Sequence, residues 1–485
     1  MASIKKNFIF NFLLSISQIV FPLITFPYIT HILLPEDVGL VNFVDSFCRY
    51  IILFSALGIP IYGVREIAKV KDNINKLETL TNELVSINFI LSILFLFIFF
   101  IFIFTIQKLQ INYKLYLIGS CMIISNVFSF EWYFQGIEEF KYITVRNIGI
   151  KIFLSVLTFF IIKRESDVIP YFLLTVLSYF ITAVINFLHA KKNIKLKLIF
   201  NLNGLKKHFK PLLLIFSTIF FVSAYTLMDT LILGFLTDDK TVGIYTTGLK
   251  IAKIPMLFIG ALGVVLIPRL SKSYFHNEEA DFLLLINKSV NFVITFSLPI
   301  FFYIFANSNT IIYLIAGKNY SESAIVLQIL SVLGLLVGLS NIFGMQVLTT
   351  MSKDKYFTIS VLAGTISSVL LNLLFIPKFK EIGSAFSNIT SEVLVTIMTI
   401  YFASKFIKIK IDYGFIIKNI LYGIPLLIIP KFLYINNISL FYNFVLSALI
   451  SLTYFLIIQL FVIKNMFIVL YYDKLKKQLW RSSTI

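Results

Sequence analysis

Residues 94–104 read LFLFIFFIFIF, without a charged or polar side chain. They lie inside a predominantly apolar stretch at 82–105, about as long as an α-helix must be to cross the hydrocarbon core of a bilayer. A membrane-spanning β-strand would alternate apolar and polar side chains, and this stretch does not. Because similar stretches recur along the chain, the pattern predicts an all-α polytopic membrane protein.

The composition agrees with this fold class. Of the 485 residues, 58% are hydrophobic and 14% are charged, with a mean hydropathy of +0.91. A soluble protein carries about 25% charged residues. These values exclude a soluble enzyme, a disordered chain and a secreted disulfide scaffold. The two cysteines, Cys48 and Cys121, fall in apolar runs and predict neither a disulfide framework nor a metal cluster.

About fourteen transmembrane helices are predicted, because roughly 281 apolar residues would fill about fourteen spans of about 20 residues. Turn residues or charges separate the spans. The predicted ranges are 8–30, 39–61, 82–105, 113–134, 144–162, 168–189, 211–236, 244–267, 288–306, 324–350, 357–376, 382–404, 413–430 and 438–463.

The net charge of +18 is explained by topology rather than by nucleic-acid binding, because the basic residues punctuate the apolar runs. If the N-terminus is cytoplasmic, the cytoplasmic segments hold 29 Lys and Arg residues and the opposite loops hold 9. The positive-inside rule therefore predicts that both termini are cytoplasmic. All loops are too short to form a separate domain on either side.

An internal repeat is predicted at an offset of 204 residues. Val38-Gly39 matches Val242-Gly243, Arg49 matches Lys253, and Arg65 matches Arg269. The match places helices 1–6 over helices 7–12, as two parallel six-helix lobes around a central cavity. The predicted organisation is an N-terminal lobe at 1–190, a basic cytoplasmic linker at 191–210, a second lobe at 211–405, and two additional helices with a basic cytoplasmic tail at 406–485.

A cationic cavity is predicted from basic residues inside the spans. Arg or Lys at a helix centre costs about 2.5–3.5 kcal/mol on insertion scales, so several together indicate a function. Arg49, Lys250 and Lys253 are the predicted ligands of an anionic substrate. Asn42, Asp45 and Arg49 are spaced i, i+3 and i+7, which places them on one stripe of a helix. Thr246, Lys250 and Lys253 form a similar stripe on the matched helix.

Other polar residues inside or near spans are weaker candidates for lining the cavity or for coupling transport to an ion. They are Gln18, Asp229, Lys151, Glu131 and Glu392. Along the first helix, Asn11 and Gln18 share a polar stripe, and Thr218 and Tyr225 do so near Asp229.

Structural pairing is the alternative interpretation of these charges. Asp45 and Arg49 are spaced to neutralise each other along one helix. In this interpretation Asp229 forms an ion pair with Lys250 or Lys253. In this interpretation the Lys151 side chain extends its ammonium group toward the membrane surface.

Pro22 and Pro27 make the first helix a candidate hinge, because each removes a backbone donor. The alternative is that membrane helices tolerate proline routinely. The four histidines fall at helix ends or in loops and predict no metal site, and the chain has no glycine-rich phosphate loop. No cofactor is predicted.

Several motifs resemble those of Wzx-type polysaccharide flippases of the MOP superfamily. They are Asn11…Gln18…Pro35-Glu36-Asp37-Val38-Gly39, Leu57-Gly58, Tyr62-Gly63-Val64-Arg65-Glu66, and Glu131-Trp132-Tyr133-Phe134-Gln135-Gly136 followed by Lys141-Tyr142. Length, helix number, six-plus-six repeat and termini agree with that family over the whole chain.

The resemblance implies a non-enzymatic flippase in the bacterial cytoplasmic (inner) membrane. Its substrate would be an undecaprenyl-diphosphate-linked oligosaccharide repeat unit for O-antigen, capsule or a related glycan. It also implies coupling to H⁺ or Na⁺, contact with membrane lipids, and partnership with a polysaccharide polymerase and chain-length proteins. No nucleic-acid partner is expected.

Three other classes remain open from the residues. A lipid II flippase or a multidrug exporter would share the superfamily, although an exporter of organic cations favours acidic residues in its cavity. A membrane-embedded glycan polymerase or ligase would need a larger external loop with catalytic residues. A scaffold would leave the repeated charges inside the spans unexplained.

Overall fold

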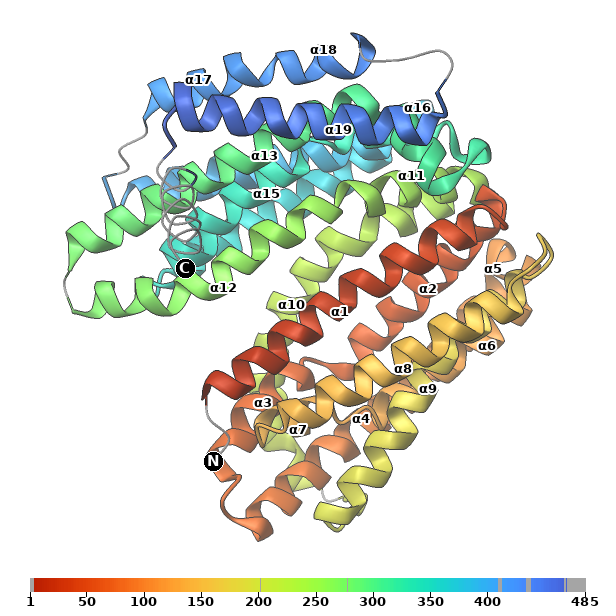
Figure 1. The fold of residues 1–485 in the computed structure, drawn as a ribbon. Helices are drawn as coiled ribbons and strands as arrows, with labels where there is room; N and C mark the ends of the chain where they lie inside the picture. Colours follow the sequence, from red (N-terminus) through yellow and green to blue (C-terminus); the bar gives the residue numbers. More distant parts are fainter. Residues whose placement is uncertain are drawn as a thin grey trace, which may run out of the picture. The chain divides into compact units, whose positions relative to one another are not determined.

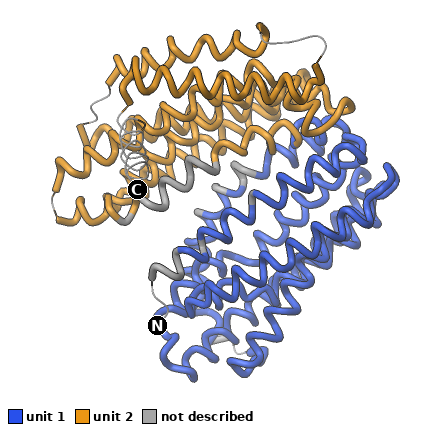
Figure 2. Tube along the Cα trace, viewed as in Figure 1, with its two compact units in different colours: residues 1–246 blue, residues 247–485 orange. Residues whose placement is uncertain are grey.

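The computed structural model describes residues 4–200, 202–276, 278–408, 412–432, 438–465 and 468. Two compact units divide the chain, Met1–Thr246 and Thr247–Ile485 (Figure 2). The regular elements in the described part are all helices. Among them, eleven are long and apolar enough to cross a membrane. The predicted all-α polytopic fold is confirmed, whereas the count of fourteen spans is not.

The first unit is a bundle of long helices with three short ones at their ends. Here α1 packs on α8, α8 on α9, α9 on α6, and α6 on α2 (Figure 1). The elements are α1 (Ile4–Thr30), α2 (Pro35–Ala56), α3 (Ile59–Val70), α4 (Ile74–Thr105), α5 (Gln107–Ile111), α6 (Tyr113–Val127), α7 (Glu131–Gly136), α8 (Phe140–Ile161), α9 (Val168–Asn193), α10 (Leu202–Leu236) and α11 (Asp239–Ala252), which continues into the second unit after Thr246.

The helix predicted at 39–61 ends earlier than expected. Helix α2 stops at Ala56 because Leu57 and Gly58 adopt left-handed backbone conformations, with φ of 42° and 81°. Helix α3 then begins at Ile59, with Pro60 in its first turn. A Cβ on Gly58 would also lie 3.1 Å from the backbone of α10, so both the turn and the close approach favour glycine here.

In the second unit, α13 packs against α12, α14, α15, α17 and α18. The elements are α12 (Ile254–Phe275), α13 (Glu279–Ala316), η1 (Lys318–Tyr320), α14 (Ser323–Leu330), α15 (Leu333–Asn341), η2 (Ile342–Thr349), α16 (Asp354–Ser404), α17 (Tyr413–Gly423), α18 (Pro425–Phe432), α19 (Leu440–Ile457) and η3 (Ile458–Val462).

Helix α16 joins two predicted spans, 357–376 and 382–404. A kink separates them at Lys380, whose φ and ψ are 46° and −126°. Another predicted boundary is wrong: residues 307–316 belong to the end of α13, although a loop was expected from Asn307 to Ser323. The apolar residues around Ile311 and Ile312 are buried and extend the helix.

Candidate functional site

Asp45 and Arg49 form an ion pair on α2. Arg49 Nε donates to Asp45 Oδ2 at 2.7 Å, and the arginine side chain is still 47% exposed. Its guanidinium carbon lies 5.9 Å from the centroid of the Tyr179 ring, on α9. The structure therefore contains the Asp45–Arg49 ion pair that the i, i+4 spacing allows. This pair positions an accessible guanidinium in the first unit.

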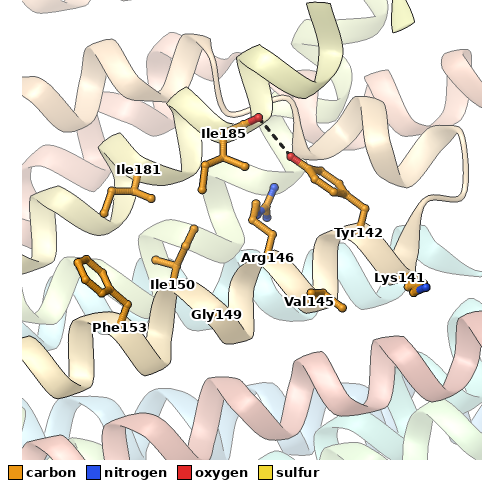
Figure 3. Close-up of a pocket in the computed structure, with 9 residues that line it drawn as sticks. All are labelled: Lys141, Tyr142, Val145, Arg146, Gly149, Ile150, Phe153, Ile181 and Ile185. Carbon is orange, nitrogen blue, oxygen red and sulfur yellow. Dashed lines mark hydrogen bonds between the residues drawn. The ribbon is translucent and has the colours of Figure 1, made fainter. Parts of the chain in front are cut away.

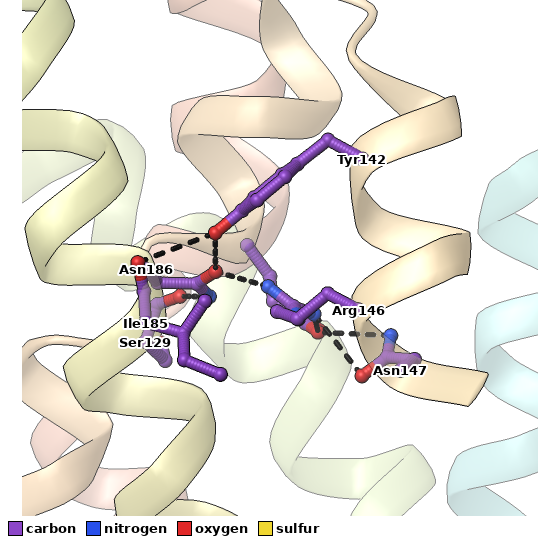
Figure 4. Close-up of polar contacts among 7 residues, drawn as sticks. Ser129, Tyr142, Arg146, Asn147, Ile185 and Asn186 are labelled. Atoms are coloured by element: carbon purple, nitrogen blue, oxygen red, sulfur yellow. Dashed lines mark hydrogen bonds and ion pairs between the residues drawn. The ribbon is translucent and has the colours of Figure 1, made fainter. Parts of the chain in front are cut away.

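A second basic residue, Arg146, is more deeply buried in the same unit than Arg49, and Figure 4 shows its polar contacts. Its side chain is only 3% exposed, and Nη2 donates to Glu131 Oε1 at 2.5 Å. It also donates to the side-chain oxygens of Asn186 and Asn147. The Tyr142 ring centroid lies 5.6 Å from its guanidinium carbon. These contacts satisfy most of the donors of a cation that would otherwise be costly to bury.

Asn186 on α9 organises this cluster. Its Oδ1 accepts from Arg146 and from the Tyr142 hydroxyl, and its Nδ2 donates to the carbonyl of Ser129. Ser129 precedes Phe130, whose φ of 48° makes the sharp turn into α7. The turn presents Glu131 to α8, so one asparagine ties α9 to both partners of the ion pair.

A groove of about 690 Å³ runs between α8 and α9 beside the cluster (Figure 3). Its walls are largely apolar, with basic groups at Lys141 and Arg146. The lining residues are Lys141, Tyr142, Val145, Arg146, Gly149, Ile150, Phe153, Ile181 and Ile185.

Lys151 and Glu131 are separate candidates in the sequence, and in the structure both belong to the first unit. Lys151 is half-buried on α8 and interacts electrostatically with the Glu131 carboxylate. Glu131 is 42% exposed while it accepts from Arg146. The Glu131 carboxylate therefore stays accessible while it is paired with buried Arg146.

Sequence reasoning missed Arg146, because a basic residue close to the start of a predicted span is most simply assigned to the cytoplasmic side. It lies almost two turns inside α8, which begins at Phe140. The signal was present in Glu131, a carboxylate whose partner had not been identified.

The helices matched by the repeat cross closely inside the first unit. A Cβ on Gly39 would collide with the carbonyl oxygen of Asp239, and one on Gly243 with that of Pro35. One turn further along each helix, Asn42 Nδ2 donates to Thr246 Oγ1 at 2.8 Å. Gly39 and Gly243 are 204 residues apart, as are Asn42 and Thr246. Positions matched by the predicted repeat thus contact each other within the first unit.

The remaining candidates lie in several places. Gln18 is exposed on α1. Asp229 is buried on α10 and accepts from the Tyr245 hydroxyl at 3.0 Å. Glu392 is buried on α16 and accepts from Ser340 Oγ at 3.0 Å. The side chains of Asn11, Thr218 and Tyr225 lie outside the described residues.

The predicted stripe of Thr246, Lys250 and Lys253 does not lie on one helix, whereas the stripe of Asn42, Asp45 and Arg49 lies entirely on α2. Lys250 is exposed near the end of α11, whereas Lys253 is half-buried at the turn between α11 and α12. Pro255 follows in the first turn of α12. Since Arg49 belongs to the first unit and Lys253 to the second, their shared cavity stays a prediction. Pro22 and Pro27 lie inside the unbroken helix α1, and their hinge role also stays a prediction.

Asp167 and Lys108 are among the titratable groups outside the spans whose pKa values are shifted. Asp167 precedes α9 and accepts from the backbone N–H groups of Lys163 and Arg164, both at 2.8 Å, which lowers its pKa. Burial lowers the pKa of Lys108 on α5, although Asp239 and Asp238 act against this shift. Within the described residues, no three His, Cys, Asp or Glu side chains gather as a metal site would require.

Long apolar helices enclosing paired charges define a multi-pass membrane protein of the transporter class. The chain belongs to the polysaccharide biosynthesis protein family, whose sequence model matches residues 4–274.

Three known proteins are similar to this chain. A relative from Escherichia coli (strain K12), named "Putative O-antigen transporter", is 25% identical over 417 residues, covering 82% of this chain and 96% of its own. The "Probable low-salt glycan biosynthesis flippase Agl15" of Haloferax volcanii is 24% identical over 239 residues, covering 47% and 50%. The solved structure of the "Lipid II flippase MurJ, inward closed conformation" shares the fold, with a TM-score of 0.72, 16% identity, and 96% and 100% coverage.

Proposed function

We propose that this chain is a flippase that moves undecaprenyl-diphosphate-linked oligosaccharide repeat units to the periplasmic leaflet by alternating access. Its family and the names of its relatives support this substrate class. A diphosphate that carries sugars cannot cross hydrocarbon unaided, because its charges would lose their hydration. The polyprenyl tail can stay in lipid. This role needs binding and movement, and we propose no catalytic step.

The observation that carries the proposal is the accessible, positioned guanidinium of Arg49. Its ion pair with Asp45 uses Nε, whereas a guanidinium has five N–H donors. Phosphate oxygens can therefore bind the Nη groups through charge-assisted, bidentate hydrogen bonds. In this proposal Lys250 and Lys253 add positive charge from the matched helices, and Asn42 and Gln18 contribute polar contacts.

Coupling to an ion gradient is assigned in this proposal to the first unit. Glu131 is the best candidate, because it is accessible and paired with buried Arg146. Protonation of Glu131 would weaken this pair and loosen the contact between α7 and α8. Asp45, Asp229, Lys151 and Glu392 are further candidates. Both termini lie in the cytoplasm of a bacterium, and a polymerase and chain-length proteins receive the product.

The test is complementation of surface-glycan display in a flippase-deficient strain, normalised to the amount of protein in the membrane. Arg49→Ala and Lys253→Ala should each impair display, because a charged hydrogen bond contributes about 1.5–3 kcal/mol, or roughly tenfold to hundredfold in affinity. Arg164→Ala is the control, since Arg164 is exposed in the loop before α9. Full display from the Arg49→Ala, Lys253→Ala double variant would overturn the proposal.

A further inference from the structure

A second cavity of the first unit lies where α4 begins and α9 ends, and neither Arg49 nor Arg146 lines it. It has a volume of about 750 Å³. Its inner wall is apolar and includes Val85, Phe89, Phe128 and Phe187. Because α4 and α9 are both candidate membrane spans, with α9 ending at Asn193, the cavity lies at an end of the membrane-spanning region.

Four exposed lysines surround this apolar wall. Lys191 and Lys192 come from the last turn of α9, and Lys195 and Lys197 from the segment that follows it. Among the described residues no acidic side chain forms an ion pair with any of the four. The acidic residue that lines the cavity, Glu78, accepts from the backbone N–H of Lys195 at 2.9 Å. The net charge around the opening is therefore positive.

The lysine-bearing segment is fixed in place by α4. Asn82 bonds the segment twice, donating to the Lys195 carbonyl and accepting from the Lys197 N–H, both at 3.0 Å. Ser86 Oγ accepts from the Ile199 N–H at 2.7 Å. Glu78, Asn82 and Ser86 are spaced four residues apart, so one stripe of α4 holds an extended backbone. Residues 194–198, which lie within the linker predicted at 191–210, are thus docked on α4 and form part of the cavity wall.

The apolar side chains of this segment pack on the first unit, and its lysine side chains face solvent. Ile194 is buried and Leu196 is half-buried against the apolar core of the first unit, while Lys195 and Lys197 are exposed. An extended chain points alternate side chains in opposite directions. The apolar residues therefore anchor the segment, and the intervening lysines present their charges at the mouth of the cavity.

We propose that this cavity binds an anionic glycerophospholipid, with its phosphate at the lysines and its glycerol and upper acyl chains against the phenylalanine wall. Basic pockets beside the ends of membrane spans suit anionic headgroups, because lysines near the membrane surface attract them electrostatically. The site is separate from Arg49 and Arg146, so the inference does not depend on the transported substrate.

The test uses the full-length protein in detergent, with native mass spectrometry to count retained lipid. Phosphatidylglycerol is compared with phosphatidylcholine of the same acyl chains, with undecaprenyl diphosphate and with inorganic phosphate. The wild type should retain phosphatidylglycerol preferentially, and Lys195→Gln combined with Lys197→Gln should weaken retention at least tenfold. Lys206→Gln combined with Lys210→Gln is the control, because both lysines are exposed in the same basic stretch but do not line the cavity.

Several results would overturn the proposal. These are equal retention of the two phospholipids, equal loss in the rim and control variants, or binding of undecaprenyl diphosphate that phosphatidylglycerol does not displace. Saturation by inorganic phosphate alone would also do so, since it would show that the apolar wall has no role. All four substituted lysines are exposed, so the melting temperatures of the variants should match the wild type and separate lost binding from lost folding.

Discussion

At the scale of single residues, the two arginines of the first unit differ in what their removal would leave behind. Arg146 is buried among Glu131, Asn186 and Asn147, whereas Arg49 is half solvated beside Asp45. An exposed ion pair contributes about 0–1 kcal/mol to stability, but removing one partner of a buried pair costs about 3–5 kcal/mol. Arg146 therefore stabilises the bundle, whereas the Arg49 side chain stays accessible to solvent.

This contrast predicts opposite outcomes for two alanine variants. Arg146→Ala should lower the free energy of unfolding by about 3 kcal/mol, near the lower limit for a buried pair because Glu131 is partly solvated. Arg49→Ala should cost less than about 1 kcal/mol while impairing transport. Unfolding in detergent gives the comparison. Equal destabilisation by the two variants would show that Arg49 is also structural.

At the scale of elements, the crossing of α2 and α11 depends on the absence of two side chains. The backbones approach so closely at Gly39 and Gly243 that any Cβ meets a carbonyl oxygen of the other helix. Small residues at such positions let membrane helices pack by van der Waals contact and form hydrogen bonds across the interface. The Asn42–Thr246 hydrogen bond is one such bond.

We therefore expect Gly39→Ala and Gly243→Ala to push the two helices apart, at a cost of about 2 kcal/mol or more through overpacking. Gly149→Ala is the matched control, because a Cβ on this helical glycine meets nothing within 4 Å. It should be neutral or stabilising by up to about 1 kcal/mol. Melting temperatures of the three variants test this close crossing. An unchanged melting temperature for Gly39→Ala would contradict it.

The loop before α9 gives a prediction about pH. Two backbone N–H groups favour the ionised form of Asp167 and hold its pKa below the usual value in the folded chain. The stabilisation is therefore present above the unfolded pKa of about 3.9 and disappears as pH falls through the lower folded value. Asp167→Asn should lower the melting temperature near about pH 7, and the difference should shrink as pH falls below the unfolded pKa. A difference independent of pH would show that charge has no part in it.

At the scale of the whole molecule, the sequence predicted the features that hydrophobicity alone determines. The predicted spans at 82–105, 168–189 and 324–350 are helical in the structure. In a bilayer, a long apolar stretch forms a helix because its backbone N–H and C=O groups must bond to each other. The break after Ala56 escaped prediction because it depends on the close approach of α10 to Gly58. The burial of Arg146 escaped for a similar reason, since its acceptors come from α7 and α9.

The orientation of the chain provides the last prediction. The basic residues divide 29 to 9 between alternate loops, and a charge bias of this kind sets orientation during insertion. Helices η1 and α10 begin in loops that this count assigns to opposite sides. In a variant with Cys121→Ser, an impermeant thiol reagent should label Asn319→Cys in intact cells and Lys206→Cys only after permeabilisation. Both sites are exposed, and the remaining Cys48 is buried. Labelling of position 206 in intact cells would overturn the predicted orientation.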